Sequence, residues 1–127
     1  MQRLRFFGWW LAGGVLIAVL IATGSLVPPA DLPKVAVSDK VEHFGGYLLL
    51  SLWFSGLFRP GRYLVVGAAL VAFSGGLEIA QGVMAIGRTA DWWDFLANTL
   101  GVTTGLGIAV AGLGSWMLAI ERGFGGR

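Results

Sequence analysis

The chain has no cysteine and few charged residues. Only 13% of its 127 residues are Asp, Glu, Lys or Arg, whereas 56% are hydrophobic. A soluble globular domain usually carries about 25% charged residues, so this composition excludes an ordinary water-soluble domain. The hydrophobic excess also excludes a disordered chain. Without cysteine, the chain forms neither a disulfide framework nor a thiolate metal site.

The chain also has little net charge. Its formal charge is +2 at pH 7, and no stripe of Lys and Arg runs through the sequence. Nucleic-acid binding depends on such basic patches. We therefore expect no nucleic-acid partner.

What the sequence does contain is long uncharged runs, which cover residues 6–30, 43–58, 63–77 and 95–120. A bilayer core about 30 Å thick is crossed by roughly 20 helical residues. The first and last runs are long enough alone, whereas the two middle runs suffice only if each helix includes charged residues at one end. The pattern predicts an all-α polytopic membrane protein with a single transmembrane domain. We expect a bundle of four transmembrane helices, at about 6–27, 39–58, 62–86 and 92–120.

The orientation of such a bundle follows from the Lys and Arg residues that flank its helices. Six lie in the two terminal tails and the turn between the second and third helices: Arg3, Arg5, Arg59, Arg62, Arg122 and Arg127. Three lie on the opposite side: Lys34, Lys40 and Arg88. We therefore expect both termini in the cytoplasm. The first apolar run exceeds the core of a signal peptide, about 7–15 residues, so we expect it to remain as a helix.

Polar residues collect at the outer ends of the last three predicted helices. Their spacing of three or four residues places them on one face of each helix. Ionisable groups in a membrane are costly, at least ~2.5 kcal/mol each at the helix centre, and are kept where they face one another or a wet cavity. This clustering predicts a functional site. Its members are Asp39, Lys40, Glu42, His43 and Tyr47, then Glu78 and Gln81, then Arg88, Asp91, Asp94 and Asn98.

The same residues carry a resemblance to a known family. Asp39-Lys40-x-x-His43-Phe44-x-x-Tyr47 resembles the first motif of the VanZ-like membrane proteins. The second motif is similar to Glu78-x-x-Gln81 followed by Gly87-Arg88-x-x-Asp91-x-x-Asp94-x-x-x-Asn98-Thr99-x-Gly101-x-x-x-Gly105. The resemblance spans nearly the whole chain and implies a small protein of the bacterial inner membrane. The namesake is linked to low-level resistance to the glycopeptide teicoplanin, which supplies a phenotype rather than a reaction.

One hypothesis is an enzyme that acts on a lipid-linked or cell-envelope substrate bearing an anionic group. His43 and Glu78 would transfer protons, since histidine exchanges protons near neutral pH and Glu78 is the deepest carboxylate. Arg88 and Lys40 would hold the anion, with Arg88 able to clamp phosphate or carboxylate in bidentate fashion. The remaining predicted roles are orientation or cation binding by Asp91 and Asp94, and hydrogen bonding by Gln81, Asn98 and Tyr47, with Asp39 beside the substrate.

The alternative hypothesis is a non-catalytic protein that binds a lipid head group or a partner, with its polar cluster holding the helices together. Glu78 would then form an ion pair with Arg88 or Lys40, and Lys40 would otherwise extend to head groups. Asp39 and Glu42 would serve as a cap of the second helix, and Asp91 or Thr89 as the cap of the fourth.

Cofactors and partners are less well defined. His43 has carboxylates available as co-ligands, but the sequence has no His-x-x-x-His or Glu-x-x-His pair, so we assign no metal. The expected partners are membrane lipids, a lipid-linked envelope precursor and a second copy of the chain. A transporter is disfavoured because four helices lack the repeated halves of carriers. Five Trp residues near helix ends fit aromatic belts at the membrane surface: Trp9, Trp10, Trp92, Trp93 and Trp116.

Overall fold

The computed structural model describes residues 1–33, 38–85 and 87–125. It is built from five α-helices and three short 3-10 helices, and the described residues contain no strand. The α-helices are α1 (Phe7–Leu26), α2 (Asp39–Leu57), α3 (Tyr63–Val83), α4 (Trp92–Val110) and α5 (Trp116–Gly125). The 3-10 helices are η1 (Pro29–Asp31), η2 (Pro60–Arg62) and η3 (Leu113–Ser115). The all-α class predicted from the sequence is confirmed. Lys34, Ile86 and Arg127, which were used in the prediction, lie outside the described residues.

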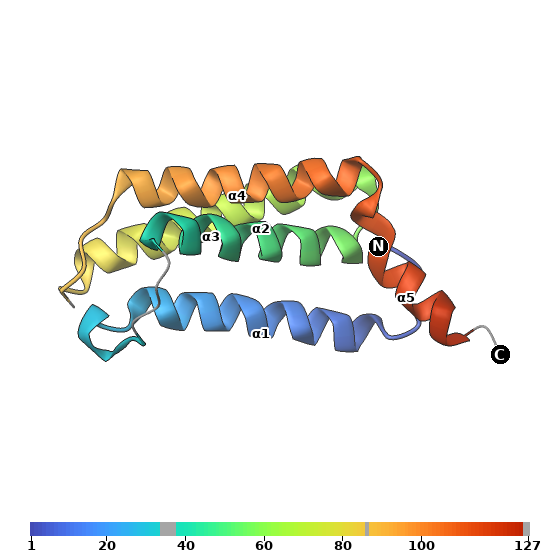
Figure 1. Cartoon of the computed structure of the whole chain (residues 1–127), viewed down its shortest axis with the longest axis horizontal. Helices are drawn as coiled ribbons and strands as arrows, with labels where there is room; N and C mark the ends of the chain where they lie inside the picture. The colour runs from blue at the N-terminus through green and yellow to red at the C-terminus, as the bar shows by residue number, and fades with distance from the viewer. Residues whose placement is uncertain (34–37, 86, 126–127) are drawn as a thin grey trace.

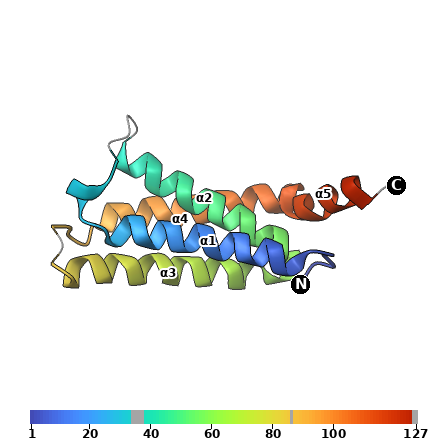
Figure 2. The same cartoon turned by 90° about the horizontal axis from the view of Figure 1, so that it is seen from below.

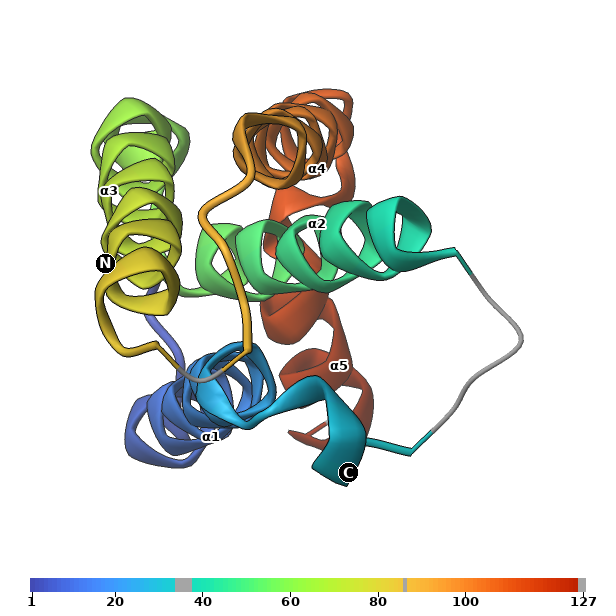
Figure 3. The same ribbon diagram turned by 90° about the vertical axis from the view of Figure 1, so that its left-hand side faces the viewer.

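Helices α1 to α4 form a bundle in which α1 and α3 run in one direction and α2 and α4 in the other (Figure 1). Seen end on, α2 runs obliquely past α1, α3 and α4 (Figure 3). The core is formed by Tyr47 and Leu50 of α2, Val66 and Leu70 of α3, and Val102 of α4. Helix α1 contributes partly buried apolar side chains to this core, but its other face is exposed.

Helix α2 packs most extensively against α4. Gly105 lies at this contact, where an added Cβ would lie 2.8 Å from the carbonyl oxygen of Leu48. Small residues allow helix backbones to approach closely. The Gly101-x-x-x-Gly105 pattern therefore sets the closest helix pair of the bundle.

Within the described part of the chain, two helical segments are long and apolar enough to cross a membrane, namely α1 and the segment Pro60–Val83. Their exposed faces carry large apolar side chains such as Leu16, Leu20 and Leu64. A third span is counted if α4 and the segment Leu113–Gly125 are taken as one bent unit. Helix faces that expose many large apolar side chains are typical of surfaces that contact lipid.

The fourth helix differs from the sequence prediction of one helix over 92–120. It ends at Val110, and the following segment turns by 88° into α5. The cause is local, because Gly112 has a φ of 128°, which is incompatible with continued helix. Helix α5 therefore extends past the end of the bundle (Figure 2).

Two further predictions need correction. Helix α2 is capped by Ser38, whose hydroxyl accepts the backbone N–H of Val41, so Asp39 is the first helical residue rather than the cap. Trp10 and Trp116 are not simple belt residues, because they pack with Trp53 at ring-centroid distances of 5.5–5.9 Å. This cluster joins α1, α2 and α5.

Candidate functional site

The predicted polar residues lie at the end of the bundle where α2 and α4 begin and α3 ends (Figures 1 and 3). Within this group, the side chains of Lys40 and His43 from α2 contact residues at the start of α4, and Asp39 pairs with both of them. Asp39 and His43 are four residues apart, so both side chains lie on one face of the helix. The polar residues that the sequence predicts to lie together therefore do meet at one end of the bundle.

Lys40 bridges α2 and α4. Its ammonium group donates to Asp91 Oδ2 at 2.9 Å and to Asp94 Oδ1, and it lies 3.8 Å from Asp39 Oδ2. The Lys40 side chain is 46% exposed, so solvent weakens these ion pairs. A substrate anion bound by Lys40 would have to compete with the three carboxylates that already surround its ammonium group.

Asp91 begins α4. Its carboxylate accepts the backbone N–H of Trp93 at 2.8 Å, so of the two proposed caps, Asp91 and Thr89, the structure selects Asp91. The hydrogen bond from Lys40, followed by that from the Trp93 N–H, holds the pKa of Asp91 below its usual value. The cap of α4 is thus negatively charged near neutral pH.

Glu78 reaches the same turn from α3. It is 7% exposed, and its Oε2 accepts the backbone N–H of Asp91 at 3.1 Å. Among the described residues it forms no ion pair with Arg88 or Lys40. The contact makes Glu78 a residue that positions the start of α4.

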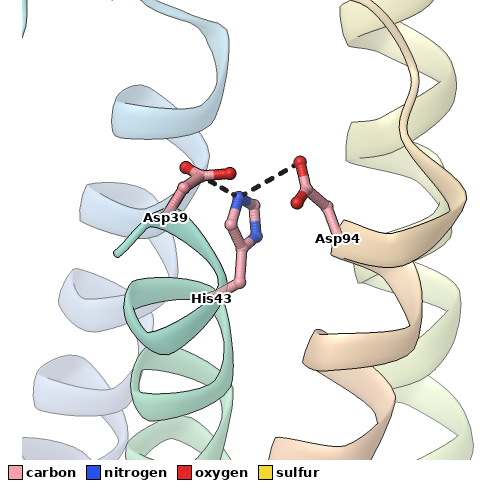
Figure 4. A group of neighbouring side chains, drawn as sticks. All are labelled: Asp39, His43 and Asp94. Carbon is pink, nitrogen blue, oxygen red and sulfur yellow. Dashed lines mark ion pairs between the residues drawn. The ribbon is translucent and has the colours of Figure 1, made fainter. Parts of the chain in front are cut away.

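His43 is held by a buried hydrogen-bond chain. Its Nδ1 lies 2.9 Å from Asn98 Oδ1, and the Asn98 amide nitrogen donates to Ser74 Oγ at 2.8 Å. Its Nε2 faces Asp39 Oδ1 at 3.7 Å and Asp94 Oδ2 at 3.5 Å (Figure 4). The donor atoms of Asp39, His43 and Asp94 all lie within 4.8 Å of one another, so this trio is a set that could hold a metal ion.

Arg88 and Gln81 contact the C-terminal end of α1 rather than the residues of α2 and α4. Arg88 donates to the carbonyls of Val27 and Gly24 at 3.2 and 3.3 Å, and Gln81 donates to the carbonyl of Ser25 at 2.7 Å. Cationic side chains commonly satisfy the free carbonyls at a helix C-terminus. The two residues therefore hold the end of α1 against the α3–α4 connection.

A cavity of about 280 Å³ adjoins the cluster. Its lining combines apolar residues such as Leu20 and Ile21 with polar residues such as His43, Asp39 and Arg88. A second cavity of about 280 Å³, between Arg88 and Asp94, is lined mainly by polar residues. Tyr47, which is 2% exposed, lines the first cavity while packing in the core. Arg88 and Asp39 line both spaces.

Ser74 is the site residue that the sequence analysis missed. It is fully buried and completes the chain from His43 through Asn98. It lies four residues before Glu78, hence on the same face of α3, and this spacing was a usable signal. A serine in an apolar helix seldom draws attention because it can hydrogen bond within its own helix.

No protein-family model, curated protein or solved structure matches this chain. The resemblance of its motifs to the VanZ-like proteins therefore stays a prediction of the sequence. Function is inferred from the geometry at the polar end of the bundle.

Proposed function

We propose that the chain is a VanZ-like protein of the bacterial inner membrane with four transmembrane spans, α1 to α4. Helices α1 and α3 are parallel, so the chain must return across the bundle between them, and α2 makes this return (Figure 1). Helix α4 then runs back beside α2. Their 19 residues each correspond to about 28 Å of helix, close to the bilayer core. Their deeper polar residues, Asp94 and Asn98, are buried against other helices, and the exposed Asp39, Lys40 and Glu42 lie in the first turn of α2, at the end of the span.

We place the end opposite the polar cluster in the cytoplasm. The N-terminal segment, the end of α2 and η3 meet there, since Gln2 donates to the carbonyls of Leu57, Phe58 and Gly114. This end carries the arginine-rich segments of the chain, which favours the cytoplasmic side. The polar cluster then lies at the outer face, and both termini are cytoplasmic.

In this position the protein would bind a lipid-linked envelope substrate with an anionic head group and process that group. The single observation that carries this proposal is the mixed lining of the cavity beside α1. Leu20, Ile21 and Leu32 offer an apolar wall, and His43 and Arg88 offer polar groups at the same opening. Such a lining fits an amphiphile better than a fully water-soluble molecule.

The proposed chemistry uses the hydrogen-bond donors of Arg88 and the acceptor nitrogen of His43. Arg88 uses two of its N–H groups on α1 carbonyls, and its other donors are available for a phosphate or carboxylate. His43 Nε2 would accept the proton of an attacking hydroxyl or water, and Asp94 would stabilise the resulting imidazolium. This arrangement supports hydrolysis or phosphoryl transfer at the outer leaflet. Through that step the protein would affect envelope properties, including glycopeptide susceptibility.

The test combines binding and turnover in lipid nanodiscs. Polyprenyl phosphate and peptidoglycan-precursor lipids are incubated with the full chain, with and without Mg²⁺, and bound and converted lipid are measured by mass spectrometry. We expect Arg88→Gln to weaken retention, Arg88→Lys to keep part of it, and His43→Gln to abolish conversion while lipid is still retained. Arg59→Gln, at the opposite end, is the matched control. Unchanged lipids with all variants would overturn the enzymatic proposal.

A second candidate is a non-catalytic protein whose cluster joins the helices and binds a head group. One observation favours it: the described residues contain no buried side-chain N or O atom without a hydrogen-bond partner. Lys40 and Arg88 are also both engaged by protein groups. This candidate predicts retention of anionic lipid without conversion, and an unchanged phenotype for His43→Gln at equal abundance.

A further inference from the structure

We infer that Asp39, His43 and Asp94 form a binding site for a divalent transition-metal ion at the mouth of the polar cluster. The inference does not depend on the proposed substrate, because metal binding is measured on the protein alone. With an ion bound to Nε2, His43 would be a metal ligand and would not accept the proton assigned to it above. The site joins the first two turns of α2 to the first turn of α4, and Figure 4 shows both carboxylates directed at the imidazole.

The tautomer of His43 is the first argument. The Asn98 amide is assigned with its nitrogen donating to Ser74 Oγ; in this orientation the Asn98 oxygen faces His43 and accepts a hydrogen bond from Nδ1–H. A neutral imidazole therefore carries its lone pair on Nε2. Metal-binding histidines are usually held in this way, with the second ring nitrogen donating to an oxygen acceptor.

The surroundings of Nε2 are the second argument. The lone pair points at two carboxylate oxygens, 3.5 and 3.7 Å away, and neither is a donor. Donor atoms bound to one tetrahedral metal ion at about 2.1 Å lie about 3.4 Å apart. The two separations from Nε2 thus need little adjustment, and the carboxylate oxygens of Asp39 and Asp94, which lie within 4.8 Å of each other, would move closer together around an ion.

The carboxylates around Lys40 leave an excess of negative charge at the site. Three carboxylates, from Asp39, Asp91 and Asp94, lie around the single ammonium group of Lys40. Lys40 contacts Asp94 through Oδ1, which leaves Oδ2 facing His43. A bound dication would neutralise the remaining negative charge.

The donor set and its exposure define the type of ion. One imidazole nitrogen and two carboxylate oxygens suit Zn²⁺ or Mn²⁺ better than Mg²⁺ or Ca²⁺, which prefer all-oxygen sites. The side chains of His43 and Asp94 are 11% exposed and that of Asp39 is 61% exposed, so the ion can enter from Asp39. Three protein ligands leave coordination positions open, as in catalytic sites.

The test uses the full chain in detergent after chelator treatment. Mn²⁺ binding is followed by electron paramagnetic resonance, Zn²⁺ binding by calorimetry and Co²⁺ binding by visible absorption. We expect one ion per chain, and affinities at least about tenfold weaker in His43→Gln and Asp94→Asn. Asp31→Asn, which removes an exposed carboxylate of η1 outside the trio, is the matched control and should bind as wild type does.

A second variant guards against loss of fold. Because the chain has no cysteine, His43→Cys would introduce a single thiol, and Co²⁺ should then give a thiolate-to-cobalt charge-transfer band. The inference is overturned if wild type shows no saturable binding of any of the three ions. It is equally overturned if the His43 and Asp94 variants bind as tightly as wild type, in which case a proton on Nε2 joins the two carboxylates instead. Neither result depends on the lipid assays, so failure here and failure of the proposed function are distinguishable.

Discussion

Gly101 of α4 lies directly against the peptide carbonyl of Phe44 in α2. A Cβ added at Gly101 would collide with that oxygen and would lie 3.1 Å from the amide nitrogen of Leu48. These are backbone atoms of a helix and cannot rotate away. The contact fixes how closely the two helices that carry the polar cluster approach each other.

Gly101→Ala should therefore destabilise the bundle. The two helices must separate to admit a methyl group, and overpacking of this kind costs about 1–3 kcal/mol. Gly107→Ala is the matched control, because that helical glycine has open space around it and alanine is the better helix former by about 0.5–1 kcal/mol. Thermal unfolding in detergent should show a lower Tm for Gly101→Ala and an equal or higher Tm for Gly107→Ala. Equal Tm values for both variants would contradict the close contact.

Glu78 gives a prediction that separates a hydrogen-bond acceptor from a charge. Its carboxylate accepts the backbone N–H of Asp91. Glu78→Gln keeps an acceptor oxygen and should unfold close to wild type. Glu78→Leu leaves a part-buried donor without a partner and should lose about 1–3 kcal/mol.

The measurement is again thermal unfolding, with both Glu78 variants at the same detergent concentration. If Glu78→Gln is as unstable as Glu78→Leu, the charge itself matters, and Glu78 belongs with the ionic groups of the cluster. In that case its role as a positioning residue is wrong.

The sequence predicted the helices and the end of the bundle where polar residues meet, because both depend on spacing. A lack of charge over 6–30 and four-residue steps such as Asp39 to His43 are visible without coordinates. The partners of individual groups were not predictable. Arg88 was expected to hold an anion, yet it contacts the carbonyls of Gly24 and Val27, which lie more than 60 positions earlier in the chain.

The bend after α4 was missed for a different reason. Twenty-one glycines are spread through the chain, so Gly112 did not stand out, and an uncharged run over 95–120 is compatible with one long helix. Only the backbone shows its positive φ. Tertiary contacts then hold α5 in the bent position, through Glu121 and through the Trp10, Trp53 and Trp116 cluster.

Glu121 should provide the main hydrogen bonds that hold α5 to the start of α1. Its carboxylate accepts the backbone N–H groups of Arg5 and Phe6 at 2.6 and 2.9 Å, and the indole N–H of Trp10 at 2.8 Å. An acidic group is favourable at this position because the N-terminus of α1 is the positive end of its dipole. Glu121→Gln removes the charge and presents an NH2 group to donors.

We expect Glu121→Gln to lower the Tm and to shift tryptophan emission to longer wavelength, since Trp10 loses its partner. Arg122→Gln also removes one charged group from the same helix, with the opposite sign, and is the control. Its side chain forms no ion pair within the described part of the chain. If both variants unfold alike, a general change of charge explains the result and the hydrogen bonds of Glu121 are not specific.

The position of α5 should depend on Gly112. Its φ of 128° lies in a region that residues with a Cβ adopt only under strain, at a cost of about 1–3 kcal/mol. Gly112→Ala should therefore lower the Tm, although an added Cβ would meet no atom within 4 Å. Gly123→Ala, also in open space but inside α5, should not. The decisive readout is tryptophan fluorescence, because straightening the bend would carry Trp116 away from Trp10 and Trp53. A variant with unchanged Tm and unchanged emission would mean that the bend is set by packing of α5 rather than by the backbone of Gly112.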